Sequence, residues 1–158
     1  MGLSRVYVGF SSTDLHYYNL MKAWKKSDNT EFNFAECGLR HEIKSEDEAY
    51  IKSVCRKHLK NAGTFIQLIG EDTRYKYKYV RWEAEVALEK GCRIIGVNLD
   101  GTREYNDDTC PPILRNKGAL FVPFKLKVIQ YALDNFQSQT SKNWSFKDSI
   151  YKKFGVEE

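Results

Sequence analysis

The chain has 158 residues and a mass of 18.4 kDa, the size of one globular domain, which argues against a two-domain enzyme. Apolar residues make up 42% of it, enough for a folded core, and 25 Lys and Arg against 21 Asp and Glu leave a net charge of +4. This excess is too small to indicate a nucleic-acid partner. Without a long apolar segment or a signal peptide, we expect a cytoplasmic protein that does not bind membranes.

The cysteines and histidines predict neither a disulfide framework nor a metal site. Four cysteines fall at wide, unequal spacings with no C-x-x-C motif: Cys37, Cys55, Cys92 and Cys110. His16 and His41 have no Cys or His at ligand spacing. We therefore expect reduced structural thiols and no bound metal.

The first half of the chain predicts two strands and two helices. Residues 5–10 (RVYVGF) form a β-branched and aromatic run typical of a buried strand, and a helix follows over 14–26 with apolar residues at every third position. A brief strand is expected at 31–37. Ser45 and Glu48 then match a Ser-x-x-Glu capping box, which predicts the start of the second helix.

The second half predicts a strand–helix alternation. Residues 64–70 and 93–99 are near-continuous apolar runs, typical of parallel strands that are covered on both faces. A helix is expected between them from 73 to 90. A last strand at 119–124 and a helix over 126–136 complete the pattern.

This order of elements predicts an α/β fold, a flavodoxin-like three-layer sandwich with a central parallel sheet of about five strands. We assign residues 1–139 to one domain and 140–158 to a C-terminal extension of unknown role. In such a sheet, ligands bind beyond the carboxyl ends of the strands.

Several common enzyme motifs are missing from the loops at that edge. The loop after the first strand lacks Gly-x-Gly-x-x-Gly, and no Gly-x-x-x-x-Gly-Lys-Ser/Thr occurs, which argues against hydride transfer and P-loop NTP hydrolysis. Ser11 and Ser12 have no convincing His and Asp partners for a hydrolase triad.

Glu83 is the candidate site carboxylate in the helix expected at 73–90. At about 100° per residue it lies about 85° from the centre of the apolar stripe, whereas Glu85 and Glu89 fall in the solvent half. Glu83 could therefore be partly buried at a crevice. The alternative is a rim residue that pairs with Arg81 or Lys90 or is simply solvated.

Residues 74–82 (RYKYKYVRW) alternate cations with aromatic residues just ahead of Glu83. Such interleaving can hold phosphates and stack bases, or it can be a solvated helix entry. Because the run is short and lies near a helix N-terminus, it suits a nucleotide better than a nucleic acid.

Four segments resemble the prokaryotic TIR-like (Toll/interleukin receptor-like) domains, particularly those of the Thoeris anti-phage defence type. They are residues 68–73 (LIGEDT), 79–83 (YVRWE), 89–97 (EKGCRIIGV) and 5–11 (RVYVGFS), the last followed by Asp14. The order of elements agrees with that family over about residues 4 to 137. Two positions depart from its pattern: Tyr79 replaces a frequent Trp, and Gly9 replaces a Ser.

The resemblance implies an enzyme that splits the nicotinamide–ribose bond of NAD and releases ADP-ribose or a cyclised form of it as a messenger. Glu83 matches the family's catalytic glutamate by position. Phe10 and Tyr79 are the candidates for contacts with the substrate's rings, and Ser11 and Asp14 for polar contacts. NAD is then a substrate, and no cofactor is expected.

The leading hypothesis is thus a TIR-type NAD glycohydrolase or ADP-ribose cyclase in antiviral defence. Its expected partners are NAD or a related nucleotide, further copies of the chain, and a separate effector protein that senses the product. Two alternatives stay open: a non-catalytic TIR-like module that binds a nucleotide or assembles with itself, and a nucleoside deoxyribosyltransferase, which shares the fold class and a catalytic carboxylate.

Overall fold

A six-stranded parallel sheet forms the centre of the molecule. The computed structural model describes residues 5–27, 34–35, 47–60, 62–76, 78–136 and 142–155. Its strands are β1 (Arg5–Gly9), β2 (Phe34–Ala35), β3 (Ala62–Ile69), β4 (Arg93–Asn98), β5 (Leu120–Pro123) and β6 (Trp144–Ser145). They lie in the order β2-β1-β3-β4-β5-β6, and every neighbouring pair is parallel. The predicted α/β flavodoxin-like fold is confirmed.

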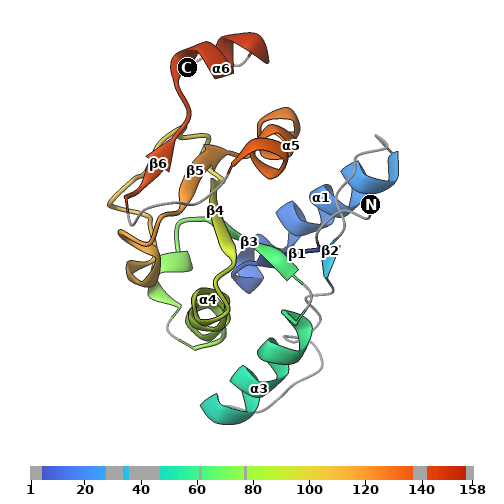
Figure 1. Cartoon of the computed structure of the whole chain (residues 1–158), viewed down its shortest axis with the longest axis vertical. Coiled ribbons are helices and arrows are strands. Elements are labelled where there is room, and N and C mark those ends of the chain that lie inside the picture. Colours follow the sequence, from blue (N-terminus) through green and yellow to red (C-terminus); the bar gives the residue numbers. More distant parts are fainter. Residues whose placement is uncertain are drawn as a thin grey trace.

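Helices cover both faces of this sheet (Figure 1). They are α1 (Leu15–Ser27), α3 (Glu48–His58), α4 (Tyr79–Glu89), α5 (Leu126–Asn135) and α6 (Asp148–Lys153), with short 3-10 turns η1 (Ser12–Asp14), η2 (Thr73–Tyr75) and η3 (Pro112–Leu114). Helices α3 and α4 lie side by side on one face, and α1 and α5 lie on the other. No helix within the described ranges is long and apolar enough to cross a membrane.

The core sits on both sides of the central strands. The last six residues of β3, the last five of β4 and all of β5 are buried. This double burial explains why their sequences are near-continuous apolar runs rather than alternating ones. The strands predicted from those runs are confirmed within one or two residues at each end.

Two predicted helix starts are wrong. Helix α3 is capped by Asp47, whose carboxylate accepts a hydrogen bond from the Tyr50 amide at 3.1 Å, and not by Ser45, which lies outside the described residues. Helix α4 begins at Tyr79, not at Thr73. The Thr73 hydroxyl instead accepts a hydrogen bond from the Gly70 amide at 2.8 Å, which closes a tight turn before the helix.

Residues 142–155 continue the fold beyond α5. β6 pairs with β5 through Leu120↔Trp144 and Phe121↔Ser145, so the sheet has six strands where about five were expected. Tyr151 on α6 is buried, and its hydroxyl donates to the Arg103 carbonyl at 3.1 Å. The segment therefore packs against the domain.

Candidate functional site

A cavity of about 480 Å³ lies where the loop after β1 meets the start of α4. We call it the α4 cavity, and its lining residues are Ser11, Ser12, Tyr75, Lys76, Lys78, Tyr79 and Val80. Two lysines and no carboxylate belong to this set, so the cavity favours an anion. Aromatic rings of two tyrosines add surfaces on which a base or a nicotinamide ring can stack.

Glu83 is buried beside this cavity. Its side chain comes from the second turn of α4, and the residue is only 2% exposed. The Tyr7 hydroxyl on β1 donates a hydrogen bond to Glu83 Oε2 at 2.5 Å. The alternative of a solvated rim residue is therefore wrong, and Arg81 pairs with Glu85 instead, at 2.8 Å.

The Glu83 carboxylate does not itself line the α4 cavity. Tyr79 and Val80 do, and they precede Glu83 by four and three residues. One helical turn, about 5.4 Å along the axis, therefore separates the cavity-lining positions from Glu83. The Glu83 carboxylate is thus set back from the cavity wall by one turn of α4.

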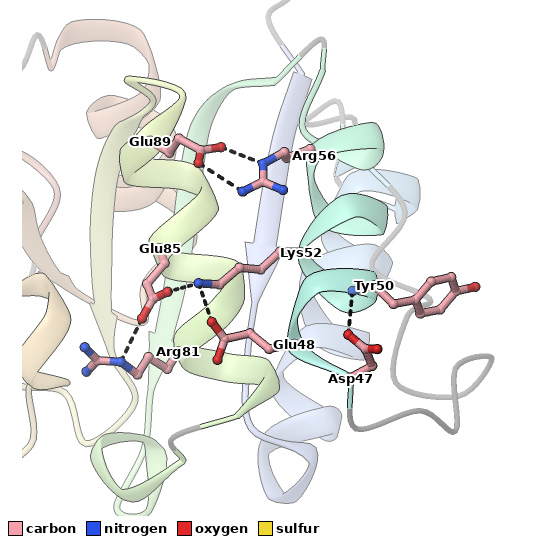
Figure 2. Close-up of polar contacts among 8 residues, drawn as sticks. All are labelled: Asp47, Glu48, Tyr50, Lys52, Arg56, Arg81, Glu85 and Glu89. Carbon is pink, nitrogen blue, oxygen red and sulfur yellow. Dashed lines mark hydrogen bonds and ion pairs between the residues drawn. The ribbon is translucent and has the colours of Figure 1, made fainter.

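Ion pairs with basic residues engage the other two glutamates of α4, Glu85 and Glu89, and link this helix to α3 (Figure 2). Glu85 forms ion pairs with Lys52 and Arg81. Glu89 accepts hydrogen bonds from Arg56 Nε at 2.7 Å and from Arg56 Nη2 at 3.0 Å. Both glutamates thus point toward α3 or solvent rather than under the helix. Burial opposes the ionisation of Glu85, but Lys52 and Arg81 outweigh it and lower the pKa of that carboxyl.

Asp72 ties the loop after β1 to the loop after β3. Its Oδ2 accepts hydrogen bonds from Ser11 Oγ at 3.2 Å and Thr13 Oγ1 at 2.8 Å, and Lys76 Nζ lies 3.6 Å away. Burial alone raises the pKa of Asp72, but the two hydroxyl donors and Lys76 together lower it below its ordinary value. The network fixes Ser11, a predicted polar contact, at the wall of the α4 cavity.

The other predicted site residues lie at different places. Tyr79 lines the α4 cavity, with its ring 5.8 Å from that of Trp82. Phe10 is buried and stacks on Tyr18 at 4.7 Å, outside the residues that line the cavity. Its role as a ring contact therefore stays a prediction.

Asp14 lines a separate cavity of about 490 Å³ at the carboxyl ends of β3 and β4. A Cβ atom on Gly70 would lie 2.5 Å from Asp14 Oδ2, so the glycine makes room for that carboxylate. Glu71, Asp72 and Asp100 line the same cavity, which makes it strongly acidic. The negative charge of a nucleotide's diphosphate is repelled by these carboxylates, whereas the lysines of the α4 cavity attract it.

Sequence patterns missed two residues of the site, Tyr7 and Asp72. A Tyr in a strand that is buried on both faces needs a hydrogen-bond partner for its hydroxyl. This need is the one feature of the sequence that could have pointed to Tyr7 as a residue of the site. Within the part of the chain that the structure describes, no group of three or more His, Cys, Asp or Glu residues could hold a metal ion.

Comparison with known proteins supports a family assignment. Residues 7–104 match the model of the family described as Thoeris protein ThsB, TIR-like domain. This match runs from the middle of β1 to beyond the end of β4 and includes every residue that lines the α4 cavity. No curated protein matches the chain.

Proposed function

The chain belongs to the family of Thoeris ThsB TIR-like domains, a family of defence proteins, and on this premise we propose that it cleaves the nicotinamide–ribose bond of NAD. The product is ADP-ribose or a cyclised form, which a separate effector protein would sense. The observation that carries the proposal is the buried Glu83 carboxylate, one helical turn from a cationic cavity with two tyrosines in its wall.

The proposed chemistry needs a single carboxylate. As the bond between the ribose anomeric carbon and the pyridinium nitrogen breaks, its electron pair moves to that nitrogen, and nicotinamide leaves as a neutral molecule. Because the leaving group needs no proton, no general acid is required. The anomeric carbon gains oxocarbenium character, which the Glu83 carboxylate stabilises. Attack by water, which loses a proton, gives ADP-ribose, and attack by a nucleophile within the same molecule gives the cyclised form.

The cationic wall is suited to the rest of NAD. Lys76 and Lys78 can pair with the diphosphate, and the rings of Tyr75 and Tyr79 can stack on its aromatic groups. Because Glu83 does not line the cavity, we expect a change in conformation to bring the ribose and the carboxylate into contact. Self-association of the chain is one way to drive that change, so the enzyme is expected to be more active at high protein concentration.

The experiment measures nicotinamide released from NAD, with the mass of the second product, at low and high protein concentration. We expect Glu83→Gln to lower the rate by at least about 100-fold, with little change in melting temperature. Glu85→Gln is the matched control, because it makes the same chemical change two residues away in the α3–α4 ion pairs, and it should keep the activity. Full activity of Glu83→Gln would overturn the proposal, and a parallel incubation with deoxynucleosides tests for base exchange.

A binding-only module is the second candidate, and the Tyr7–Glu83 hydrogen bond favours it, because it gives the carboxylate a structural role without catalysis. In that case the chain binds NAD or ADP-ribose in a calorimetric titration and releases no nicotinamide at any concentration. Glu83→Gln then leaves defence against phage unchanged in cells, whereas the enzymatic proposal expects defence to be lost.

A further inference from the structure

A smaller cavity lies on the other side of the loop that leads into α4. It has a volume of about 220 Å³, and we call it the Gln67 cavity; its lining residues are Gln67, Arg74, Lys76, Val80, Arg81, Pro111, Pro112 and Ile113. It shares only Lys76 and Val80 with the α4 cavity. At this volume it fits a small ligand rather than a whole dinucleotide.

Gln67 lines this cavity and carries a buried acceptor oxygen. The residue is 0% exposed, and its Nε2 donates to the carbonyl oxygens of Gly9 at 3.1 Å and Leu68 at 3.2 Å. Both amide hydrogens are thus used, and a flipped amide would set Oε1 against two carbonyls, so the orientation is fixed. No described residue donates to Oε1. A buried acceptor in that state calls for a ligand with an O–H or N–H group.

Three cations line the same cavity, and none of its lining residues is a carboxylate. Arg81 uses only Nε on Glu85, which leaves its four terminal N–H groups for a ligand. Arg74 contacts the carbonyls of Asp107 and Asp108, which are neutral partners. Guanidinium groups bind phosphate oxygens in pairs, so the cations call for a phosphate group.

We propose that the Gln67 cavity binds a phosphorylated sugar. The phosphate pairs with Arg74 and Arg81, and a hydroxyl of the sugar donates to Gln67 Oε1. Inorganic phosphate satisfies only the first of these, and a neutral sugar only the second. The proposal does not depend on cleavage of NAD, because it concerns binding alone and a cavity that Tyr79 does not line.

The test is a calorimetric titration of the whole chain with ribose 5-phosphate, inorganic phosphate and ribose. Ribose 5-phosphate should bind at least tenfold more tightly than phosphate, and ribose should not bind measurably. Arg81→Gln and Arg74→Gln should each weaken ribose 5-phosphate binding at least tenfold. Two controls should leave it unchanged: Lys57→Gln, an exposed cation on α3, and Lys78→Gln, which lines only the α4 cavity.

Gln67→Met tests the acceptor. It should reduce the affinity for ribose 5-phosphate to that for inorganic phosphate and leave the latter unchanged. Three results would each overturn the proposal. The original chain could bind ribose 5-phosphate and inorganic phosphate equally well, Arg81→Gln and Arg74→Gln could leave ribose 5-phosphate binding unchanged, or Lys78→Gln could abolish it instead. If Gln67→Met fails to fold, the comparison of the three ligands together with the arginine variants decides the question. Loss of nicotinamide release in Glu83→Gln bears only on the proposed NAD cleavage.

Discussion

Tyr7 and Glu83 lie 76 positions apart in the sequence, and the hydroxyl of the first donates to the carboxylate of the second at 2.5 Å. The bond joins β1 to α4 through two buried side chains. A buried polar group that loses its hydrogen-bond partner costs free energy, so both groups depend on this contact. The same contact therefore fixes the helix on the sheet and holds the carboxylate in place.

Tyr7→Phe should destabilise the fold by about 1–3 kcal/mol, because it leaves a buried carboxylate without its donor. Urea denaturation measures this change, and Tyr50→Phe, which alters an exposed ring on α3, is the control and should have almost no effect. Combined with Glu83→Ala, which removes the acceptor, Tyr7→Phe should show a coupling energy of at least about 0.5 kcal/mol in a double-mutant cycle. Strictly additive effects would contradict a direct interaction.

Gly9→Ser restores the residue common in the family and should nevertheless destabilise this chain. A Cβ atom at Gly9 would lie 2.7 Å from Phe65 Cζ, closer than van der Waals contact allows. Overpacking of this kind costs about 1–3 kcal/mol. In urea denaturation, the double variant Gly9→Ser with Phe65→Leu should lose less unfolding free energy than the two single variants lose together. If the two losses simply add, the Phe65 ring is not what the new side chain meets.

Stability should depend on Asp72 in a defined pH window. Because its folded pKa lies below the unfolded value of 3.8, Asp72 contributes stability above that pH and loses it as the pH falls through the lower folded pKa. The melting temperature of the original chain should therefore exceed that of Asp72→Asn from pH 7 down to about 5, and the gap should close below about pH 4. A gap that persists at the lowest pH would mean that the charge is not the cause.

Cys110 should resist alkylation in the native protein. Burial, the largest cause, raises the pKa of its thiol to about 12, so almost no thiolate is present at pH 8. Peptide mass spectrometry after iodoacetamide treatment should find Cys110 unmodified in the folded chain and modified in guanidinium chloride. Rapid labelling under native conditions would contradict the buried placement.

Most of the fold follows from local patterns in the sequence. The apolar runs over 64–70 and 93–99 predict β3 and β4 because strands covered on both faces need continuous apolar residues. The start of α4 is missed, since residues 73–78 carry no helix breaker and the turn depends on the contact between Thr73 and Gly70. The pairing of β6 with β5 is missed for a different reason, because a strand of two residues shows no periodic pattern in the sequence.

The candidate site is predicted in part. Helical spacing places Glu83 at the edge of the apolar stripe and Glu85 and Glu89 on the solvent side, and the family resemblance implies the catalytic role of Glu83. Its depth of burial depends on Tyr7, which no spacing connects to it. Likewise, the family resemblance implies Ser11 as a polar contact, but Asp72, which accepts a hydrogen bond from it, lies 61 positions away.

The pairing of β6 on β5 also determines how copies of this chain can meet. A strand at the border of a sheet presents unpaired amide and carbonyl groups that act as a template for another chain. Here the first half of β5 is already capped by the chain's own C-terminal segment, and its last residue, Pro123, has no amide hydrogen to offer. Removal of residues 142–155 would leave the outer edge of β5 unpaired and available to a strand of another chain.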